Sequence, residues 1–465
     1  KKHQKKVVVV VVVGVVSMCC FVCGAWTGGQ PWIRVGVSCS QWCPHTHQLV
    51  GAHCHPVSMD IDEGSSVSSG AEEQEKEQLG GVDSNAAVFL KMVRTVADIE
   101  DDSVAFHPEC THQIFGDDER IYGYINPRVN IYFASKSLLV YLSFTHEGLV
   151  KEEAKDRVDV LEKLTRENLG FFIGHDAPPV FARFTTDVGE FAREVEVATP
   201  SPGTVVHSFV DQDMRQVEIL KVVHSDPSFR QLASALQTLA ILFIDGASFI
   251  EVDDPNWNLF LVAERLEGES GPAHHIMGFT DVYGYFGYPD KVRMRISQFA
   301  VFPPFQRRGY GEQLLRSVYR LVLSSEEYMD LNVEDPGEDF ERMRMVTEAK
   351  ICQEGNVFNV GPDGVFPPWS KELCQEVVQK TKINRQHVRL CYEVLALISL
   401  QKSRDPEAMR QYRLSVKRRL YNQFLNIPDE EGHLQPILPA ERKMRLQMAF
   451  EFIMKEYEKV IERVL

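Results

Sequence analysis

Two glycines and two arginines lie between an apolar strand pattern and an apolar helix pattern, in the stretch Gln306–Gly311 (QRRGYG). Pro303 and Pro304 end the strand pattern before this stretch, and an apolar helical stripe follows it from near Gly309. A glycine turn at the start of a helix directs free backbone N–H groups and the positive end of the helix dipole at one point, which stabilises an anion such as phosphate. By themselves these residues indicate either a phosphate-binding loop or an ordinary tight turn.

The strand before this turn changes phase. Its apolar positions are first Val292, Met294 and Ile296 and then, one position out of step, Phe299 and Val301. Because side chains alternate strictly along a strand, the change predicts one extra residue, a β-bulge near Ser297–Gln298. A strand that is buried on both faces beyond Gln298 is the alternative, since Ala300 and Phe302 are apolar too.

The elements that hold this strand and turn belong to a chain of 465 residues, which is too long for one small core. Strand and helix patterns alternate from residue 204 onward, a helix pattern (VKEEAKDRVDVLEKLTREN) precedes them, and the C-terminal part is mostly helical. We therefore predict an α/β (α+β) protein. The predicted parts are a leader at 1–58, an acidic disordered linker at 59–86, an N-terminal α/β domain at 87–198, a second α/β domain at 199–345 and a helical domain at 346–465.

Composition narrows the class of partner. The net charge of −16 argues against binding nucleic acid through a broad basic surface and favours a basic partner. Six of the ten cysteines precede residue 55, and the other four are Cys110, Cys352, Cys374 and Cys391. This sparse remainder is typical of the reduced, buried thiols of an intracellular protein.

The first 58 residues do not resemble the rest of the chain. KKHQKK followed by VVVVVVVGVV is similar to the basic and apolar regions of a signal peptide, but the apolar run is short for a membrane span. Cys43, His45, His53 and Cys54 are zinc-ligand types at a spacing that matches no well-known finger. We interpret residues 1–58 as non-native or mispredicted sequence before a start near Met59; a cleaved secretory leader is the alternative.

The stretch Gln306–Gly311 matches the Q/R-x-x-G-x-G/A signature of the GNAT superfamily of N-acetyltransferases. The wider sequence resembles the catalytic subunits of type B histone acetyltransferases through HQIFGDDE, FIDGASFIEVDD, YGYFGYPDK, NVEDP and KINRQH. The resemblance runs from about residue 87 to the C-terminus and covers nothing before Met59. It implies a GNAT fold with a mixed, bulged and splayed central sheet, an N-terminal histone-acetyltransferase domain and a C-terminal helical domain.

The resemblance also implies acetyl-CoA as the co-substrate, and no metal. In that family the bulged strand diverges from its neighbour, and acetyl-CoA lies in the gap. The backbone of Phe299, Ala300 and Val301 would then bind the pantetheine arm. The pyrophosphate would be held by Gln306, Arg307, Arg308, Gly309, Tyr310 and Gly311.

Three acids match the catalytic acids of the family, namely Glu334, Asp335 and Asp245. A lysine amine titrates at about 10.4, so a carboxylate has to take its proton before it can attack a thioester. Glu334 ends the strand pattern YMDLNV and is the first candidate, although a solvated strand end is its alternative. Asp335 equally fits a helix N-cap ahead of Pro336. Asp245 ranks third, because the family has the longer Glu at this position.

For the substrate, the resemblance implies an acidic and aromatic groove. The matching residues are Asp117, Asp118, Glu119, Trp257, Tyr283, Gly284 and Tyr285. A cationic tail rich in lysine and glycine would pair with the carboxylates and lie across the rings. From the residues alone, a solvated turn at 117–119 and ordinary strand packing of the tyrosines are the alternatives.

The function implied is a lysine N-acetyltransferase that modifies the N-terminal tail of free, newly synthesised histone H4 by direct attack on the thioester. The family further implies a WD-repeat histone-chaperone subunit as a partner, no direct nucleic-acid or membrane partner, and a location in the nucleus and cytoplasm. The alternatives are a GNAT enzyme that acts on protein N-termini or another protein, and a non-catalytic acyl-CoA-binding subunit.

Overall fold

The structure is a computed structural model. It describes residues 80–150, 183–197, 199, 201–268, 271–362, 364–425 and 438–465. Among these residues, every helix is too short or too polar to cross a bilayer.

The N-terminal part is built on a four-stranded sheet in the order β2-β5-β6-β8. Its strands are β2 (Val88–Val93), β5 (Arg128–Ala134), β6 (Val140–Thr145) and β8 (Phe184–Thr185). Helix α6 (Val188–Glu196) buries Phe191 and Val195 against one face of this sheet, next to Tyr132 and Leu139. Shorter elements complete the part: β1 (Val82–Asp83), α2 (Ser84–Ala87), α3 (His112–Phe115), β3 (Arg120–Ile121), β4 (Tyr124–Ile125), β7 (Gly148–Leu149) and the 3-10 turns η1 (Val96–Ile99) and η2 (Asp102–Val104).

The sequence predicts that regular structure begins at Ala87. In the structure it begins earlier, at Val82. Val82 pairs with Ile121, and the Asp83 carboxylate accepts a hydrogen bond of 2.9 Å from the backbone N–H of Asn85 at the start of α2. The last residues of the predicted linker therefore belong to the folded part, because a cap and a strand pair fix them. The rest of that linker, the leader with its zinc-ligand types, and the helix pattern after Val150 lie outside the described residues.

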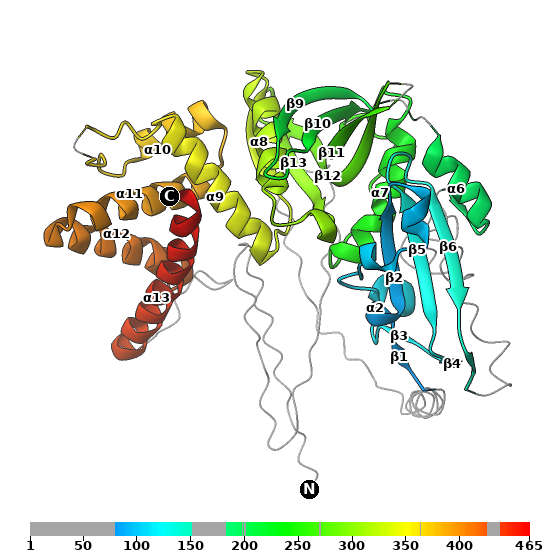
Figure 1. Ribbon diagram of the computed structural model, residues 1–465. Coiled ribbons are helices and arrows are strands. Elements are labelled where there is room, and N and C mark those ends of the chain that lie inside the picture. The colour runs from blue at the N-terminus through cyan, green and yellow to red at the C-terminus, as the bar shows by residue number, and fades with distance from the viewer. Residues whose placement is uncertain are drawn as a thin grey trace, which may run out of the picture. The chain divides into compact units, whose positions relative to one another are not determined.

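The central sheet has six strands in the order β14-β13-β12-β11-β10-β9, and every neighbouring pair is antiparallel except β13 and β14. The strands are β9 (Thr204–Val210), β10 (Gln216–Val223), β11 (Trp257–Gly268), β12 (Gly271–Gly287), β13 (Lys291–Val301) and β14 (Tyr328–Val333). Helix α7 (Phe229–Phe243) lies on one face, and helix α8 (Tyr310–Leu323) lies on the other (Figure 1).

The apolar stripes predicted from the sequence form the core between these layers. Leu232, Leu236 and Leu239 of α7 are buried, as are the leucines and valines of α8 that face the sheet. Fully burying one such side chain contributes about 1.5–3 kcal/mol. The prolines after β13 form the 3-10 turn η5 (Pro303–Phe305), which ends the strand as predicted.

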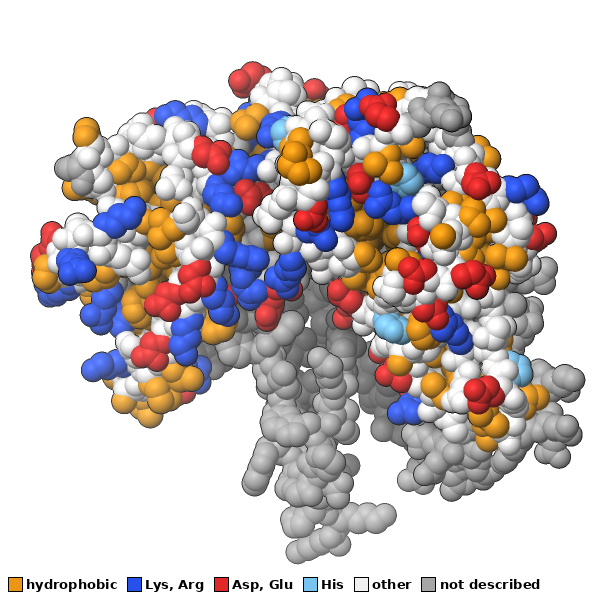
Figure 2. Space-filling view, in the orientation of Figure 1, with side chains coloured by type: hydrophobic (Ala, Val, Ile, Leu, Met, Phe, Trp, Pro, Cys, Tyr) orange, Lys and Arg blue, Asp and Glu red, His pale blue; other side chains and the backbone are white. Residues whose placement is uncertain are grey.

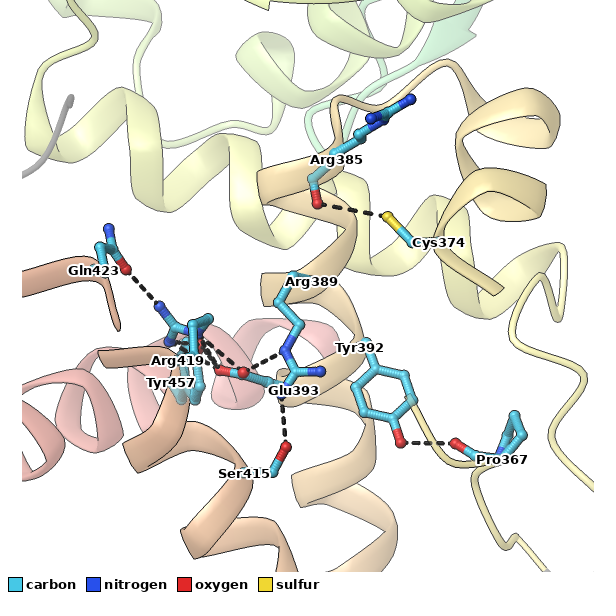
Figure 3. A network of polar contacts seen from close by, with 10 residues as sticks. All are labelled: Pro367, Cys374, Arg385, Arg389, Tyr392, Glu393, Ser415, Arg419, Gln423 and Tyr457. Atoms are coloured by element: carbon cyan, nitrogen blue, oxygen red, sulfur yellow. Dashed lines mark hydrogen bonds and ion pairs between the residues drawn. The ribbon is translucent and has the colours of Figure 1, made fainter. Parts of the chain in front are cut away.

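The C-terminal part is helical, as predicted. Its helices are α9 (Glu338–Glu354), α10 (Lys371–Thr381), α11 (Arg385–Ser403), α12 (Pro406–Phe424) and α13 (Pro439–Val464). A buried polar network ties three of them together: Glu393 of α11 accepts hydrogen bonds from Arg419 of α12 and from the Tyr457 hydroxyl of α13 at 2.7 Å (Figure 3). Lys and Arg side chains gather over these helices in Figure 2. On the face that this view shows, positively charged side chains are therefore concentrated over the helical part.

The four cysteines within the described residues are free thiols. Cys352, Cys374 and Cys391 are buried, which agrees with the prediction, whereas Cys110 is only partly buried.

Candidate active site

The predicted β-bulge is present in β13. Asp281 of β12 pairs with Gln298 and Val282 pairs with Ile296, so Ser297 is the extra residue. Because of this insertion, Phe299 comes to the same face as Ile296, towards α8. The alternative, a strand that is buried on both faces in this part, also holds in part, since Gln298 and Ala300 on the opposite face are buried.

Beyond the bulge, β13 leaves its parallel neighbour. The pairing of β13 with β14 ends at Ile296 and Val333, and the last contact is the backbone N–H of Glu334, which donates to the Ile296 carbonyl at 2.9 Å. No described strand pairs with Phe299–Val301 on this side. The sheet therefore opens next to the three residues for which the sequence predicts backbone contacts to a ligand.

The glycine turn begins helix α8 as predicted. Gly309 is the N-cap residue with φ of 84°, a conformation that favours glycine, and no side chain caps the helix. A Cβ at Gly309 would meet no atom within 4 Å, whereas a Cβ at Gly311 would lie 2.7 Å from Met343 Sδ of α9. Gly309 thus leaves open space in front of the helix N-terminus, and Gly311 permits close packing behind it.

Both arginines of the turn form ion pairs with acids from other elements. Arg307 lies 3.5 Å from Asp339 at the start of α9, and Arg308 pairs with Asp213 in the turn between β9 and β10. In the same turn, Asp211 accepts a hydrogen bond from the Tyr310 hydroxyl. Sequence reasoning missed Asp211 and Asp213, because nothing in their local pattern indicates a distant partner.

Gln306 turns its side chain back towards β13. Its amide nitrogen donates to the Val301 carbonyl at 2.9 Å. This bond fixes the end of β13 against the beginning of the glycine turn, so the two predicted cofactor-binding stretches are joined directly.

Glu334 lies where β14 ends, beside the bulge. Its carboxylate accepts a hydrogen bond of 2.8 Å from Ser297 Oγ and lies 3.3 Å from Arg295 Nη2, while its side chain remains 43% exposed. The sequence analysis did not predict that Ser297 and Arg295 contact Glu334. The register of the parallel strands β13 and β14 would have placed both residues beside it. The acid is therefore held in position and still reaches solvent.

The other two predicted acids, Asp335 and Asp245, are exposed as well. Asp335 has φ of 33°, and the N-cap of α9 is Gly337, so the capping alternative for Asp335 is wrong. The helix begins at Glu338, too far along the chain for an Asp335 cap. Asp245 follows α7 with 92% of its side chain exposed and lies 3.6 Å from His112 Nε2.

Cys110 lies near Asp245 and is poorly suited to act as a nucleophile. Burial raises the pKa of the Cys110 thiol to about 11, and the neighbouring charges of Asp245 and Glu119 add to the effect. The thiolate is the reactive form, so this cysteine stays protonated and inert at neutral pH.

Three predicted substrate residues share one face of the central sheet. Trp257 pairs with Tyr283, which pairs with Arg295, and residues directly opposite in a sheet share a face. The rings of Trp257 and Tyr283 lie 4.8 Å apart, and the Tyr285 hydroxyl accepts a hydrogen bond of 3.1 Å from Asn332. This aromatic row leads to Arg295 and thus to Glu334.

Gly284 lies on the opposite face of β12, where a Cβ would approach Val292 Cγ1 to 3.2 Å. Its backbone N–H donates to the Asn256 carbonyl at 3.1 Å. Its position is explained by close packing between strands.

The acids at 117–119 form a turn after α3. Asp117 is exposed, and Asp118 accepts a hydrogen bond of 2.7 Å from the Tyr122 hydroxyl. Glu119 accepts from the backbone N–H groups of Thr111 at 2.6 Å and His112 at 3.1 Å, so it caps α3. A role of these three acids in substrate binding stays a prediction.

Within the described part of the chain, no cluster of three or more His, Cys, Asp or Glu side chains is arranged to hold a metal ion. The zinc-ligand types at 43–54 lie outside it.

Comparisons with known proteins identify related sequences. A family model described as "Histone acetyl transferase HAT1 N-terminus" matches residues 81–245. The histone acetyltransferase type B catalytic subunit of Homo sapiens is 32% identical over 398 residues, which cover 82% of this chain and 92% of that protein. The Rattus norvegicus protein of the same name is 31% identical over the same shares, and that of Mycosarcoma maydis is 28% identical over 76% of this chain and 82% of that protein.

Among solved structures, the xEco2 acetyltransferase domain bound to a K105-CoA conjugate is 13% identical, with a TM-score of 0.23 over 32% of this chain and 92% of that chain. A TM-score this low does not support a conclusion about this chain. The human and rat relatives are matched over nearly their whole length, and the family model covers the N-terminal part. The chain therefore belongs to the family of histone acetyltransferase type B catalytic subunits and is an acetyltransferase that uses acetyl-CoA.

Proposed function

We propose that the protein acetylates lysines in the N-terminal tail of free, newly synthesised histone H4. The observation that carries the proposal is the position of Glu334 at the end of β14, fixed by Ser297 and Arg295 where β13 and β14 separate. One carboxylate thus stands between the aromatic row and the opening of the sheet.

The opening is the proposed place of acetyl-CoA. Phe299, Ala300 and Val301 would bind the pantetheine arm through the backbone on the side where β13 has no described strand partner. The turn Gln306–Gly311 would hold the pyrophosphate, since Gly309 leaves room in front of the uncapped start of α8. The residues present fit this ligand, because amides and a helix N-terminus bind phosphate oxygens whatever the neighbouring side chains are.

Glu334 is the proposed general base. A lysine with a pKa of about 10.4 arrives charged and has to lose a proton before its nitrogen attacks the thioester carbonyl. The exposed part of Glu334 can accept this proton directly or through water. Asp335 and Asp245 are second and third candidates, because neither has comparable positioning partners.

We propose direct transfer without an acyl-enzyme. Cys110, the described cysteine that is not fully buried, has a raised pKa and would be a weak nucleophile. The attacking lysine itself then forms the amide bond, and the thiol of coenzyme A leaves.

The substrate preference rests on charge and on aromatic surface. The net charge of −16 favours a cationic partner. The half-buried Tyr283 and Tyr285 offer ring surface for lysine side chains, while Trp257 is buried and packs against Tyr283. Family resemblance adds a WD-repeat histone-chaperone subunit as partner and a location in the nucleus and cytoplasm to the proposal.

The test is Glu334→Gln, assayed with labelled acetyl-CoA and histone H4. We expect turnover to fall by roughly 10²–10⁴-fold, the usual contribution of a general base, while coenzyme A binding and the melting temperature stay unchanged. Glu327→Gln is the matched control, since Glu327 is exposed and flanks the other end of β14.

Unchanged turnover in Glu334→Gln would remove this residue from its role. A parallel assay with lysine-blocked H4 tests the acceptor: label that survives the block would count against lysine transfer and favour protein N-termini.

A further inference from the structure

The turn between β9 and β10, residues Asp211–Arg215, lies against the start of α8 although it is about a hundred positions away in the chain, with separations of 95 and 99. It contacts the glycine turn at two points, and each contact uses a carboxylate. A carboxylate beside a proposed phosphate site is unexpected, because like charges repel.

The first contact is structural. Asp211 Oδ1 accepts hydrogen bonds from the backbone N–H groups of Asp213 at 2.9 Å and Arg215 at 2.8 Å, which closes the β9–β10 turn. Its other oxygen accepts from the hydroxyl of Tyr310, whose side chain is buried at the first position of α8. Asp211 therefore joins the β9–β10 turn to the helix N-terminus.

The second contact is an exposed ion pair. Asp213 pairs with Arg308, and the two side chains are 51% and 35% exposed. Arg215 Nη2 also lies 3.7 Å from the Asp213 carboxylate. Because Arg308 directly precedes Gly309, Asp213 holds the guanidinium that is nearest in the chain to the proposed phosphate site.

The other arginine of the glycine turn is paired in the same way. Arg307 lies 3.5 Å from Asp339, and both side chains are more than two-thirds exposed, at 70% and 74%. Each of the two cations that could attract a polyanion thus has a carboxylate partner from a different element.

We propose that the β9–β10 turn sets the affinity for acetyl-CoA through two acids with opposite effects: Asp213 competes with the cofactor's phosphates for Arg308, and Asp211 holds Tyr310 and the phosphate-binding start of α8 in place. This inference rests on the proposed cofactor site. It predicts that Asp211 and Asp213, which have the same charge and are separated by one residue, have opposite effects on the affinity for the cofactor: Asp211 strengthens binding and Asp213 weakens it.

Competition has a kinetic consequence. The phosphates are present in acetyl-CoA and in coenzyme A and lie away from the thioester, so Arg308 contributes uniform binding. A change at Asp213 should therefore alter the KM for acetyl-CoA and the inhibition constant of coenzyme A together, and leave kcat unchanged.

The experiment measures the Kd of coenzyme A by calorimetry on the full chain. Asp213→Asn should lower Kd by about two- to fivefold, the size of an exposed ion pair, and the gain should shrink at high salt. Asp211→Asn and Tyr310→Phe should raise Kd. Glu376→Gln breaks an equally exposed pair with Lys380 on α10 and serves as the charge-matched control, with Kd unchanged.

A double variant tests whether Asp213 acts on cofactor affinity through Arg308. In an Arg308→Gln background, Asp213→Asn should have no effect on Kd; a gain that persists there overturns competition for Arg308. An unchanged or raised Kd in Asp213→Asn alone also overturns the proposal. If Asp211→Asn tightens binding as Asp213→Asn does, general charge repulsion explains both and the opposite roles are wrong.

Further variants distinguish a failure of this inference from a failure of the proposed cofactor site on which it rests. Gly309→Ala and Arg308→Gln should both weaken binding if the glycine turn holds the phosphates. If they do so while Asp213→Asn fails to tighten binding, only the role of the β9–β10 turn is lost. If neither changes Kd in an active enzyme, the cofactor binds elsewhere and the proposed site fails as well.

Discussion

Glu348 in α9 and Asp281 in β12 are both fully buried, yet their surroundings have opposite electrostatic effects. Glu348 accepts a hydrogen bond of 2.8 Å from Arg344 and lies 2.6 Å from His387 Nδ1 of α11. Asp281 has a hydrogen bond of 3.3 Å from Gln237, and its Oδ1 has no partner among the described residues.

The pKa values differ accordingly. Burial alone would raise the pKa of Glu348, but the charges of Arg344 and His387 lower it to about 2. Burial raises the pKa of Asp281 to about 7, which the bond from Gln237 opposes only in part. The comparison teaches that a buried acid is charged or neutral according to the cations beside it.

The largest effect is expected from Glu348→Gln, which removes one partner of a buried ionic cluster. Arg344 would be left buried without its main counter-charge, so the free energy of unfolding should fall by about 3–5 kcal/mol. Urea denaturation measures this loss, with Glu376→Gln as the surface control. A loss below about 1 kcal/mol would show that the cluster is not a major source of stability.

Asp281→Asn should act in the opposite direction and depend on pH. The folded-state pKa of Asp281 is raised from 3.8 to about 7, so its contribution to stability is present below the unfolded value and is lost as the pH rises through 7. The variant should therefore gain roughly 2 kcal/mol more over the wild type at about pH 8.5 than at about pH 5.5. A gain that is the same at both pH values would mean that Asp281 does not titrate in this range.

The smallest effect on stability is expected from Asp245→Asn. Its carboxylate is 92% exposed and has His112 at 3.6 Å, so the free energy of unfolding should change by less than about 0.5 kcal/mol. Turnover should fall less than in Glu334→Gln, because Asp245 has fewer positioning contacts. A larger fall would make Asp245 the principal base and reverse the ranking.

Local patterns predicted the elements of the site well. The phase change in β13, the start of α8 near Gly309 and the strand that ends at Glu334 depend on neighbours in the sequence, and each is present. The end of the linker and the Asp335 cap were placed wrongly by a few residues, because competing caps at Asp83 and Gly337 decide where a helix begins.

Partners from distant segments could not be predicted in this way. Ser297 and Glu334 are 37 positions apart, and Arg308 and Asp213 are 95 apart, so only strand register and turn placement bring them together. The three candidate acids themselves were identified through family resemblance, since exposed Asp and Glu residues have no distinguishing pattern of their own.

The opening in the sheet depends on the one extra residue that the bulge at Ser297 adds to β13, and not on which amino acid that residue is. Any amino acid at this position adds the same extra length to β13, so substitutions there would leave the parting from β14 in place. Removing the residue altogether would return the remainder of β13 to the register of its neighbour, and would invert which of its side chains face α8. The opening itself should accordingly survive changes of side chain far better than changes of length, whereas the hydrogen bond from Ser297 that positions Glu334 depends on the hydroxyl.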